Sequence, residues 1–122
     1  METFTAFSDL RGGFTVVEFV GALDFASMEQ ARRPLRAALE AGQRRLIVDM
    51  ANLDFLDSSG LGLMVWAQRQ ADHHDAWLAW AGLRAPLMRR VRVTGLAGVL
   101  SIHPSVDAAQ QAARTDGPDG GR

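Results

Sequence analysis

Residues 57–62 read Asp-Ser-Ser-Gly-Leu-Gly, which places a carboxylate and two hydroxyls in front of two glycines. A serine hydroxyl can act as a nucleophile, accept a phosphate, or cap a helix. An apolar run follows, so Asp57 or Ser58 could accept a hydrogen bond from a backbone N–H at the start of a helix. The stretch therefore holds one hydroxyl more than a helix cap requires.

Catalytic uses of these serines fit the sequence poorly. A hydrolase nucleophile elbow requires G-x-S-x-G, and this stretch is D-S-S-G-L-G. A phosphate-binding P-loop requires a lysine, and every basic residue of the chain is an arginine. The G-x-G-x-x-G pattern of dinucleotide sites is absent as well. We therefore expect no enzymatic activity and no cofactor.

Gly60 and Gly62 fall in the first turns of the expected helix. Each glycine inside a helix costs up to about 1 kcal/mol relative to alanine. Two of them so close together indicate that something approaches the helix backbone. Either the sheet or a partner protein could occupy that space.

Two charged clusters elsewhere have simpler explanations than a site. The run Asp-His-His-Asp at 72–75 lies between a helix and a strand, and adjacent residues do not share a helix face. We expect a solvated turn there and no metal. The run Arg-Arg-Val-Arg at 89–92 has no interleaved aromatics, so a solvated helix face is expected rather than a nucleic-acid site.

The composition is that of one ordinary globular domain. The chain has 122 residues, 48% hydrophobic content, a net charge of -1 and no cysteine. The balance of charge offers no overall attraction to nucleic acid or to an anionic membrane. No secretory pattern and no run of about 20 apolar residues is seen, so a cytoplasmic protein is expected.

Strands and helices alternate along most of the chain. Apolar patterning predicts strands at 3–8, 14–23, 44–50, 76–82 and 98–103. Helical spacing predicts helices at 25–42, from 58 to about 71, at 84–95 and at 105–116. Residues 51–59 read as a connecting loop. Pro34 either kinks the first helix or lies near its true start.

The order of elements predicts an α/β fold with a single domain. The strands form a mixed, mostly parallel sheet of about five strands, with an N-terminal hairpin and about four helices. Trp77 and Trp80 differ by three positions, so they face opposite sides of their strand and one of them could be partly exposed. Ligands of such sheets gather at the carboxyl ends of strands, where Asp57 and Ser58 fall.

Several segments resemble one family in order and spacing. Residues 52–65 resemble the signature stretch of STAS-domain anti-sigma factor antagonists, in which D-S-[ST]-G-L-G opens a helix. Residues 20–24, Val-Gly-Ala-Leu-Asp, are similar to the family's G-x-L-D at a strand end. Residues 44–60 resemble its central strand and loop, and residues 85–112 its C-terminal part. The resemblance spans about residues 3–114, which implies a STAS domain at 1–114 and a disordered tail at 115–122.

The resemblance implies a regulatory role. In the family an anti-sigma factor that is also a serine kinase phosphorylates the first serine of the motif, which is Ser58 here. The unphosphorylated antagonist binds this kinase and releases a sigma factor, and a serine phosphatase resets the phosphorylated form. ATP and Mg²⁺ belong to the kinase. The alternative is a scaffold or accessory STAS domain in a signalling assembly or transport complex.

The expected partner surface surrounds Ser58. Ala22 stands where the family usually has an acid, which leaves Asp24 as a helix cap, a partner contact, or both. Ser59 is a helix residue or a second contact and phosphosite, and Leu61 is a core residue or an apolar contact. The residues expected to contact the partner are Asp24, Asp57, Ser59, Gly60, Leu61 and Gly62. A monomer or weak dimer is expected.

Overall fold

The computed structural model describes residues 3–116, and its sheet begins with a hairpin. Strands β1 (Phe4–Arg11) and β2 (Phe14–Leu23) pair antiparallel along their whole length. Gly12 and Gly13 join them with φ angles of 57° and 86°, which glycine adopts without strain. The hairpin predicted from the sequence is confirmed.

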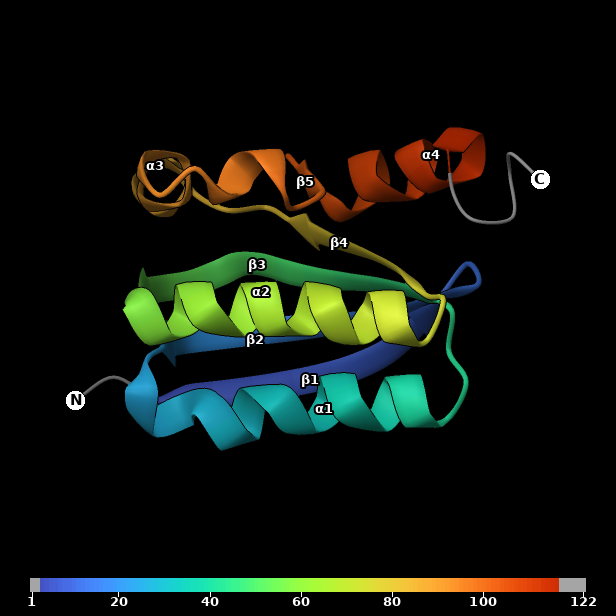
Figure 1. Ribbon diagram of the computed structural model, residues 1–122, viewed down its shortest axis with the longest axis horizontal. Coiled ribbons are helices and arrows are strands. Elements are labelled where there is room, and N and C mark those ends of the chain that lie inside the picture. Colours follow the sequence, from blue (N-terminus) through green and yellow to red (C-terminus); the bar gives the residue numbers. More distant parts are fainter. Residues whose placement is uncertain (1–2, 117–122) are drawn as a thin grey trace.

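The remaining strands pair parallel in chain order, so the sheet reads β1-β2-β3-β4-β5. Right-handed crossovers through helices connect them (Figure 1). The parallel strands are β3 (Arg45–Leu56), β4 (Trp77–Ala81) and β5 (Ile102–His103). The helices are α1 (Met28–Glu40), preceded by the 3-10 turn η1 (Phe25–Ser27), then α2 (Ser58–His73), α3 (Ala85–Val93), the 3-10 turn η2 (Leu96–Gly98) and α4 (Val106–Asp116).

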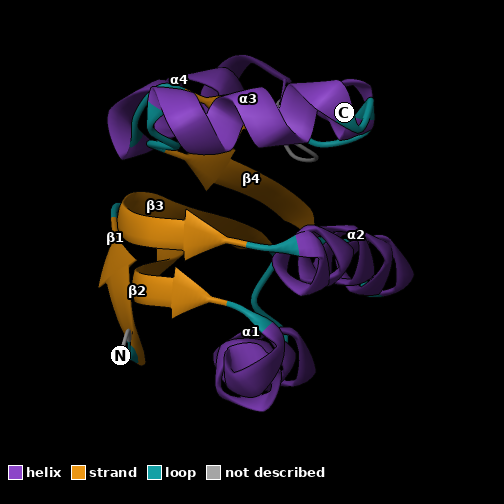
Figure 2. Ribbon diagram, turned by 90° about the vertical axis from the view of Figure 1, so that its left-hand side faces the viewer, coloured by secondary structure: helices purple, strands orange, loops and turns teal. Residues whose placement is uncertain are grey.

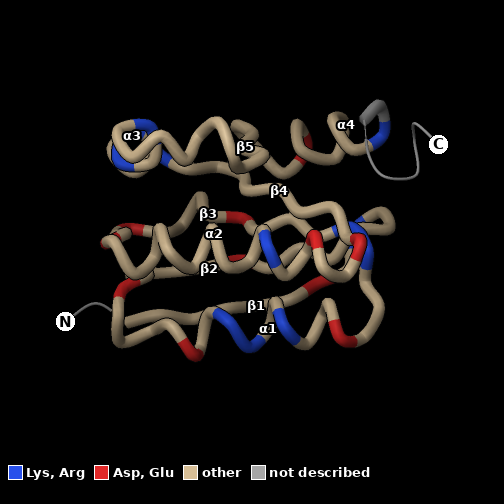
Figure 3. Tube along the Cα trace, viewed as in Figure 1, with Lys and Arg blue, Asp and Glu red and all other residues tan. Residues whose placement is uncertain are grey.

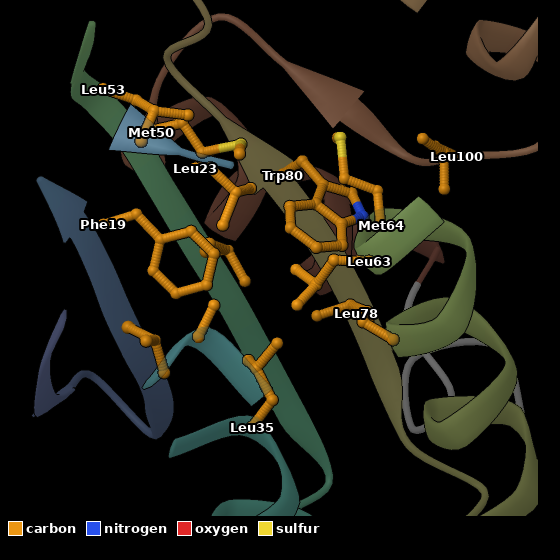
Figure 4. Close-up of a cluster of buried hydrophobic side chains, with 14 of the residues drawn as sticks. Phe19, Leu23, Leu35, Met50, Leu53, Leu63, Met64, Leu78, Trp80 and Leu100 are labelled. Carbon is orange, nitrogen blue, oxygen red and sulfur yellow. The ribbon is translucent and has the colours of Figure 1, made fainter. Parts of the chain in front are cut away.

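The main core lies between the sheet and helices α1, α2 and α3. Phe19, Leu35, Met50, Leu63 and Trp80 meet in it from five different elements (Figure 4). The Trp80 ring is fully buried, and its indole N–H has no hydrogen-bond partner. Its apolar surroundings hold the ring by packing alone.

A second, smaller core lies on the opposite face of the sheet. There α4 packs Ala109 and Ala113 against Phe14, Ile47 and Ala79. Trp77 is half-buried beside this cluster, whereas Trp80 belongs to the main core, so the two rings lie on opposite faces as expected. The single α/β fold with a five-stranded mixed sheet and four helices is confirmed.

The loop predicted at 51–59 is wrong over residues 51–56, because β3 continues to Leu56. β3 contains two residues more than the stretch of β2 it pairs with, and these break the usual alternation of buried and exposed side chains. One extra residue lies between Asp49 and Asn52, which pair with Glu18 and Val20. The other lies between the partners of Gly21 and Ala22. As a result Leu53 and Leu56 are both buried at a spacing of three. A search for alternating residues therefore ends the strand too early.

The other predicted element boundaries lie closer to those of the structure. The first helix begins at Met28 after the 3-10 turn, with Pro34 inside it, so a start nearer Pro34 is excluded. The strand predicted at 98–103 is reduced to Ile102–His103. Helix α4 continues through Asp116, and residues 117–122 of the predicted tail lie outside the described part of the chain. The domain limits at 114 stay a prediction.

Candidate functional site

The carboxyl ends of strands β2 and β3 lie side by side. Leu23 is paired with Leu56, and the Asp57 N–H donates a 3.3 Å hydrogen bond to the Leu23 carbonyl. The turns that lead into α1 and α2 therefore touch, and both open toward the same end of the molecule (Figure 2). Asp24, Asp57 and Ser58, which lie apart in sequence, come together there.

An aspartate caps each of the two turns. The Asp57 Oδ1 accepts from the Gly60 N–H at 3.1 Å at the start of α2. The Asp24 Oδ1 accepts from the Ser27 N–H at 3.1 Å, and the Ser27 Oγ accepts in return from the Asp24 N–H at 2.9 Å. This reciprocal pair is a capping box. Asp24 thus has a structural role whatever else it contacts.

Ser58 is exposed at the first position of α2. Because Asp57 supplies the cap, the Ser58 hydroxyl makes no hydrogen bond with any other described residue. The alternative left by the sequence, in which either residue caps the helix, is therefore resolved in favour of Asp57. A free, exposed hydroxyl at a helix N-terminus is accessible to a modifying enzyme.

The two glycines have different surroundings. A Cβ on Gly60 would overlap the Leu56 side chain and would lie 2.9 Å from the Leu23 carbonyl oxygen. A Cβ on Gly62 would meet nothing within 4 Å. The protein's own β2 and β3 strand ends therefore explain Gly60, which is buried, while Gly62 lies on the open surface.

Ser59 and Leu61 are both half-buried on the first turns of α2. Leu61 packs partly against the main core and also lines a groove beside α3. The structure thus assigns it a packing contact and leaves part of its side chain accessible. The packing contact accounts for the buried part of the side chain, and the contact with a partner stays a prediction.

Two aromatic residues beside the site were not anticipated. Phe25, directly after Asp24, is 81% exposed, and Phe55, in register with Ala22 at the end of β3, is 41% exposed. Exposed large apolar side chains often mark interaction surfaces, and these two lie at the ends of the paired strands β2 and β3. A phenylalanine that follows a capping acid and falls outside the helical apolar pattern is the signal that could have identified Phe25.

The charged side chains of the other two clusters are exposed. Residues 72–75 span the end of α2 and the turn after it, and residues 3–116 contain no group of three or more acidic or histidine side chains that could hold a metal. Arg89, Arg90 and Arg92 are exposed on α3. Within the described part of the chain, no helix is long and apolar enough to span a membrane.

Comparisons with known proteins agree on one family. The model of the STAS domain family matches residues 8–109. The anti-sigma-B factor antagonist of Staphylococcus aureus is 26% identical over 94 residues, which cover 77% of this chain and 87% of that protein. Several solved structures share the fold despite low identity.

The crystal structure of an anti-sigma factor antagonist from Mycobacterium paratuberculosis superposes with a TM-score of 0.84 at 20% identity, over 92% of this chain and 95% of that one. The Bacillus cell fate determinant SpoIIAA superposes in both of its forms at 22% identity and 92% coverage of this chain. The TM-score is 0.73 for the unphosphorylated form, over 96% of that chain, and 0.67 for the phosphorylated form, over 100%.

Proposed function

Because the chain belongs to the STAS domain family, we propose that it is an anti-sigma factor antagonist switched by phosphorylation of Ser58. The unphosphorylated form binds an anti-sigma factor serine kinase and so releases a sigma factor. Phosphorylation ends this binding. The observation that carries the proposal is the exposed Ser58 hydroxyl, left free because Asp57 caps the helix. Anti-sigma factor antagonists are non-enzymatic regulators, in line with the expectation from the sequence.

The proposal assigns the catalytic work to partners. The kinase brings ATP and Mg²⁺, the Ser58 Oγ attacks the γ-phosphorus, ADP leaves, and the hydroxyl proton passes to a base of the kinase. A serine phosphatase hydrolyses the phosphoserine and restores the binding form. All three proteins meet in the cytoplasm, where the sigma factor acts.

The surroundings of Ser58 suit such a modification. A phosphoserine carries a charge of about -1.5 to -2 at pH 7. At the N-terminus of α2 this charge is favoured by the helix dipole and by free backbone N–H groups, so the fold tolerates it. The switch therefore changes the surface and leaves the architecture in place.

The partner surface extends on both sides of Ser58. Phe25 and Phe55 supply exposed aromatic area, Leu61 adds apolar contact from α2, and Asp24 and Asp57 give the surface acidic groups. We include Ser59 and Gly62 in the contact area because both reach the surface on the same turns. Gly60 contributes indirectly, since its close packing sets the position of the turn.

A dianion in the middle of this surface would weaken docking strongly. In the complex the phosphate would lose water and face the acidic side chains already present. If this costs about 3 kcal/mol, affinity falls more than a hundredfold, at tenfold per 1.4 kcal/mol. No large conformational change is needed for switching.

The experiment uses a kinase captured from a lysate by the immobilised, unphosphorylated protein. Incubation with ATP should add one phosphate by intact-mass measurement, and Ser58→Ala should abolish it while Ser59→Ala does not. In calorimetry Ser58→Ala should bind the kinase as the wild type does, and Ser58→Asp should bind at least tenfold more weakly. Phosphorylation of Ser58→Ala, or equal affinities of Ser58→Ala and Ser58→Asp, would contradict the proposal.

A further inference from the structure

An open groove lies between the first turns of α2 and helix α3. It has a volume of about 420 Å³. Its lining residues are Leu61 from α2 and Pro86, Arg89, Arg90, Val93 and Thr94 from α3 and its C-terminal end. Val93 is 85% exposed there. The groove combines an apolar floor with two guanidinium groups.

The α3 segment is basic in a protein of nearly zero net charge. Residues 82–105 contain four arginines and no acidic residue, and Figure 3 shows the blue segments of α3 without red neighbours on that helix. Arg84 is occupied, since it donates to Asp54 and to the Leu53 carbonyl, both at 2.7 Å. Arg89 and Arg90 make no ion pair or hydrogen bond with any described residue.

Ser58 lies on the face of α2 that contributes Leu61 to this groove. It is three residues before Leu61 on α2, and side chains at that spacing lie on one face of a helix with Cβ atoms about 5–6 Å apart. Leu61 shares the groove with both arginines. A group attached to the Ser58 Oγ is therefore within reach of long, flexible guanidinium side chains from α3.

We propose that this groove is a binding site for a phosphate monoester dianion, and that its ligand is the phosphate of phosphorylated Ser58, held by Arg89 and Arg90. The inference rests on the proposed function for its ligand. Guanidinium groups match phosphate oxygens in geometry and charge and bind them by paired N–H donors. The site lies within one chain, so no partner protein is needed to form it.

The acidic groups nearby direct the phosphate toward the groove. Asp57 and Asp24 are held in their caps on the β2–β3 side of Ser58, and they repel a dianion from that side. Asp54, the other acid at this edge, is neutralised by Arg84. Arg89 and Arg90 instead line the groove together with Leu61, on the face of α2 that carries Ser58. Phosphorylation thus places charge over the apolar groove residues Leu61 and Val93 and removes them from the contact surface.

The test uses protein in which phosphoserine is placed at position 58 during translation, so no kinase is required. The probe is the ³¹P resonance of that phosphate, followed as a function of pH. The second ionisation of a free phosphoserine has a pKa near 6. Two arginines within contact distance should lower it by about one unit. In Arg89→Gln/Arg90→Gln the pKa should rise by about that amount, a tenfold change in proton affinity.

A charge-matched control separates the site from general electrostatics. Arg33→Gln/Arg69→Gln removes two exposed arginines, one from α1 and one from the far part of α2, that form no ion pair with another described residue, and should leave the ³¹P titration unchanged. Circular dichroism checks the fold of each variant. Should the pKa of Arg89→Gln/Arg90→Gln match that of the wild type, or should the control shift it equally, the site does not exist. Absence of kinase activity on Ser58 would sink the proposed function and leave this result intact.

Discussion

Gly60→Ala tests whether the start of α2 is set by contact with the ends of β2 and β3. The added methyl would overlap the Leu56 side chain and lie 2.9 Å from the Leu23 carbonyl oxygen. The Leu56 methyl can rotate away, but the carbonyl belongs to the backbone of β2 and cannot. We therefore expect the first turn of α2 to be pushed outward and the protein to be destabilised.

The magnitude follows from a comparison with Gly62→Ala. Overpacking of this kind costs about 1–3 kcal/mol, whereas replacing glycine by alanine in a helix gains up to about 1 kcal/mol. At Gly62, where the new Cβ meets nothing within 4 Å, only the gain applies. Because both variants gain helix propensity, the difference between them measures the steric cost. We expect Gly60→Ala to be less stable than Gly62→Ala by about 2 kcal/mol.

Urea denaturation followed by circular dichroism measures this difference directly. In thermal unfolding the two variants should differ by about 8 °C, since a chain of 122 residues shifts about 4 °C per kcal/mol. Wild type should fall between them. Equal stability of the two variants would show that the first turn yields freely, and would refute the assignment of Gly60 to close packing.

Substitutions at three further positions test the turns that follow β2 and β3. Asp57→Ala removes the cap on α2 and should cost about 1 kcal/mol in urea denaturation, while Asp57→Ser, which retains a capping oxygen, should cost less than half of that. Asp24→Ala breaks the capping box and should cost a similar amount, which a separate urea titration measures; no loss would mean that the turn is held by other contacts. Phe25→Ala should leave stability within about 0.5 kcal/mol because the side chain is exposed. The same variant should weaken kinase binding in calorimetry, whereas Phe19→Ala should lose about 3–5 kcal/mol of stability from the buried core.

Much of this architecture could be predicted because most strands and helices carry the residue pattern typical of their type. The run at 14–23 is rich in β-branched and aromatic residues, and β2 has those bounds. Ser58 opens α2 as the D-S-S-G-L-G pattern indicated. In both places the local preference and the tertiary packing favour the same structure, so sequence patterns alone are sufficient.

The parts that were missed depend on partners distant in sequence. The end of β3 is a strand only because β2 lies beside it and because two extra residues are accommodated as bulges. The role of Gly60 required knowing that Leu23 and Leu56 end next to each other. Residue type alone does not reveal the exposure of Phe25, since Phe7, Phe25 and Phe55 are exposed while Phe4, Phe14 and Phe19 are buried. Pairing and exposure of this kind are properties of the folded chain.

The strands lie in the sheet in the order in which they occur along the chain, and this order affects how the protein folds during translation. Every strand from β2 onward pairs with the strand made just before it, so no strand waits for a distant partner to leave the ribosome. The hairpin and α1 can form first, and β3 then adds to an existing edge. The Ser58 turn is complete once α2 has been made, before α3, β5 and α4 exist. The surface that the proposed function uses on β2, β3 and α2 is therefore assembled by the first 73 residues, while the basic groove is finished only when α3 arrives.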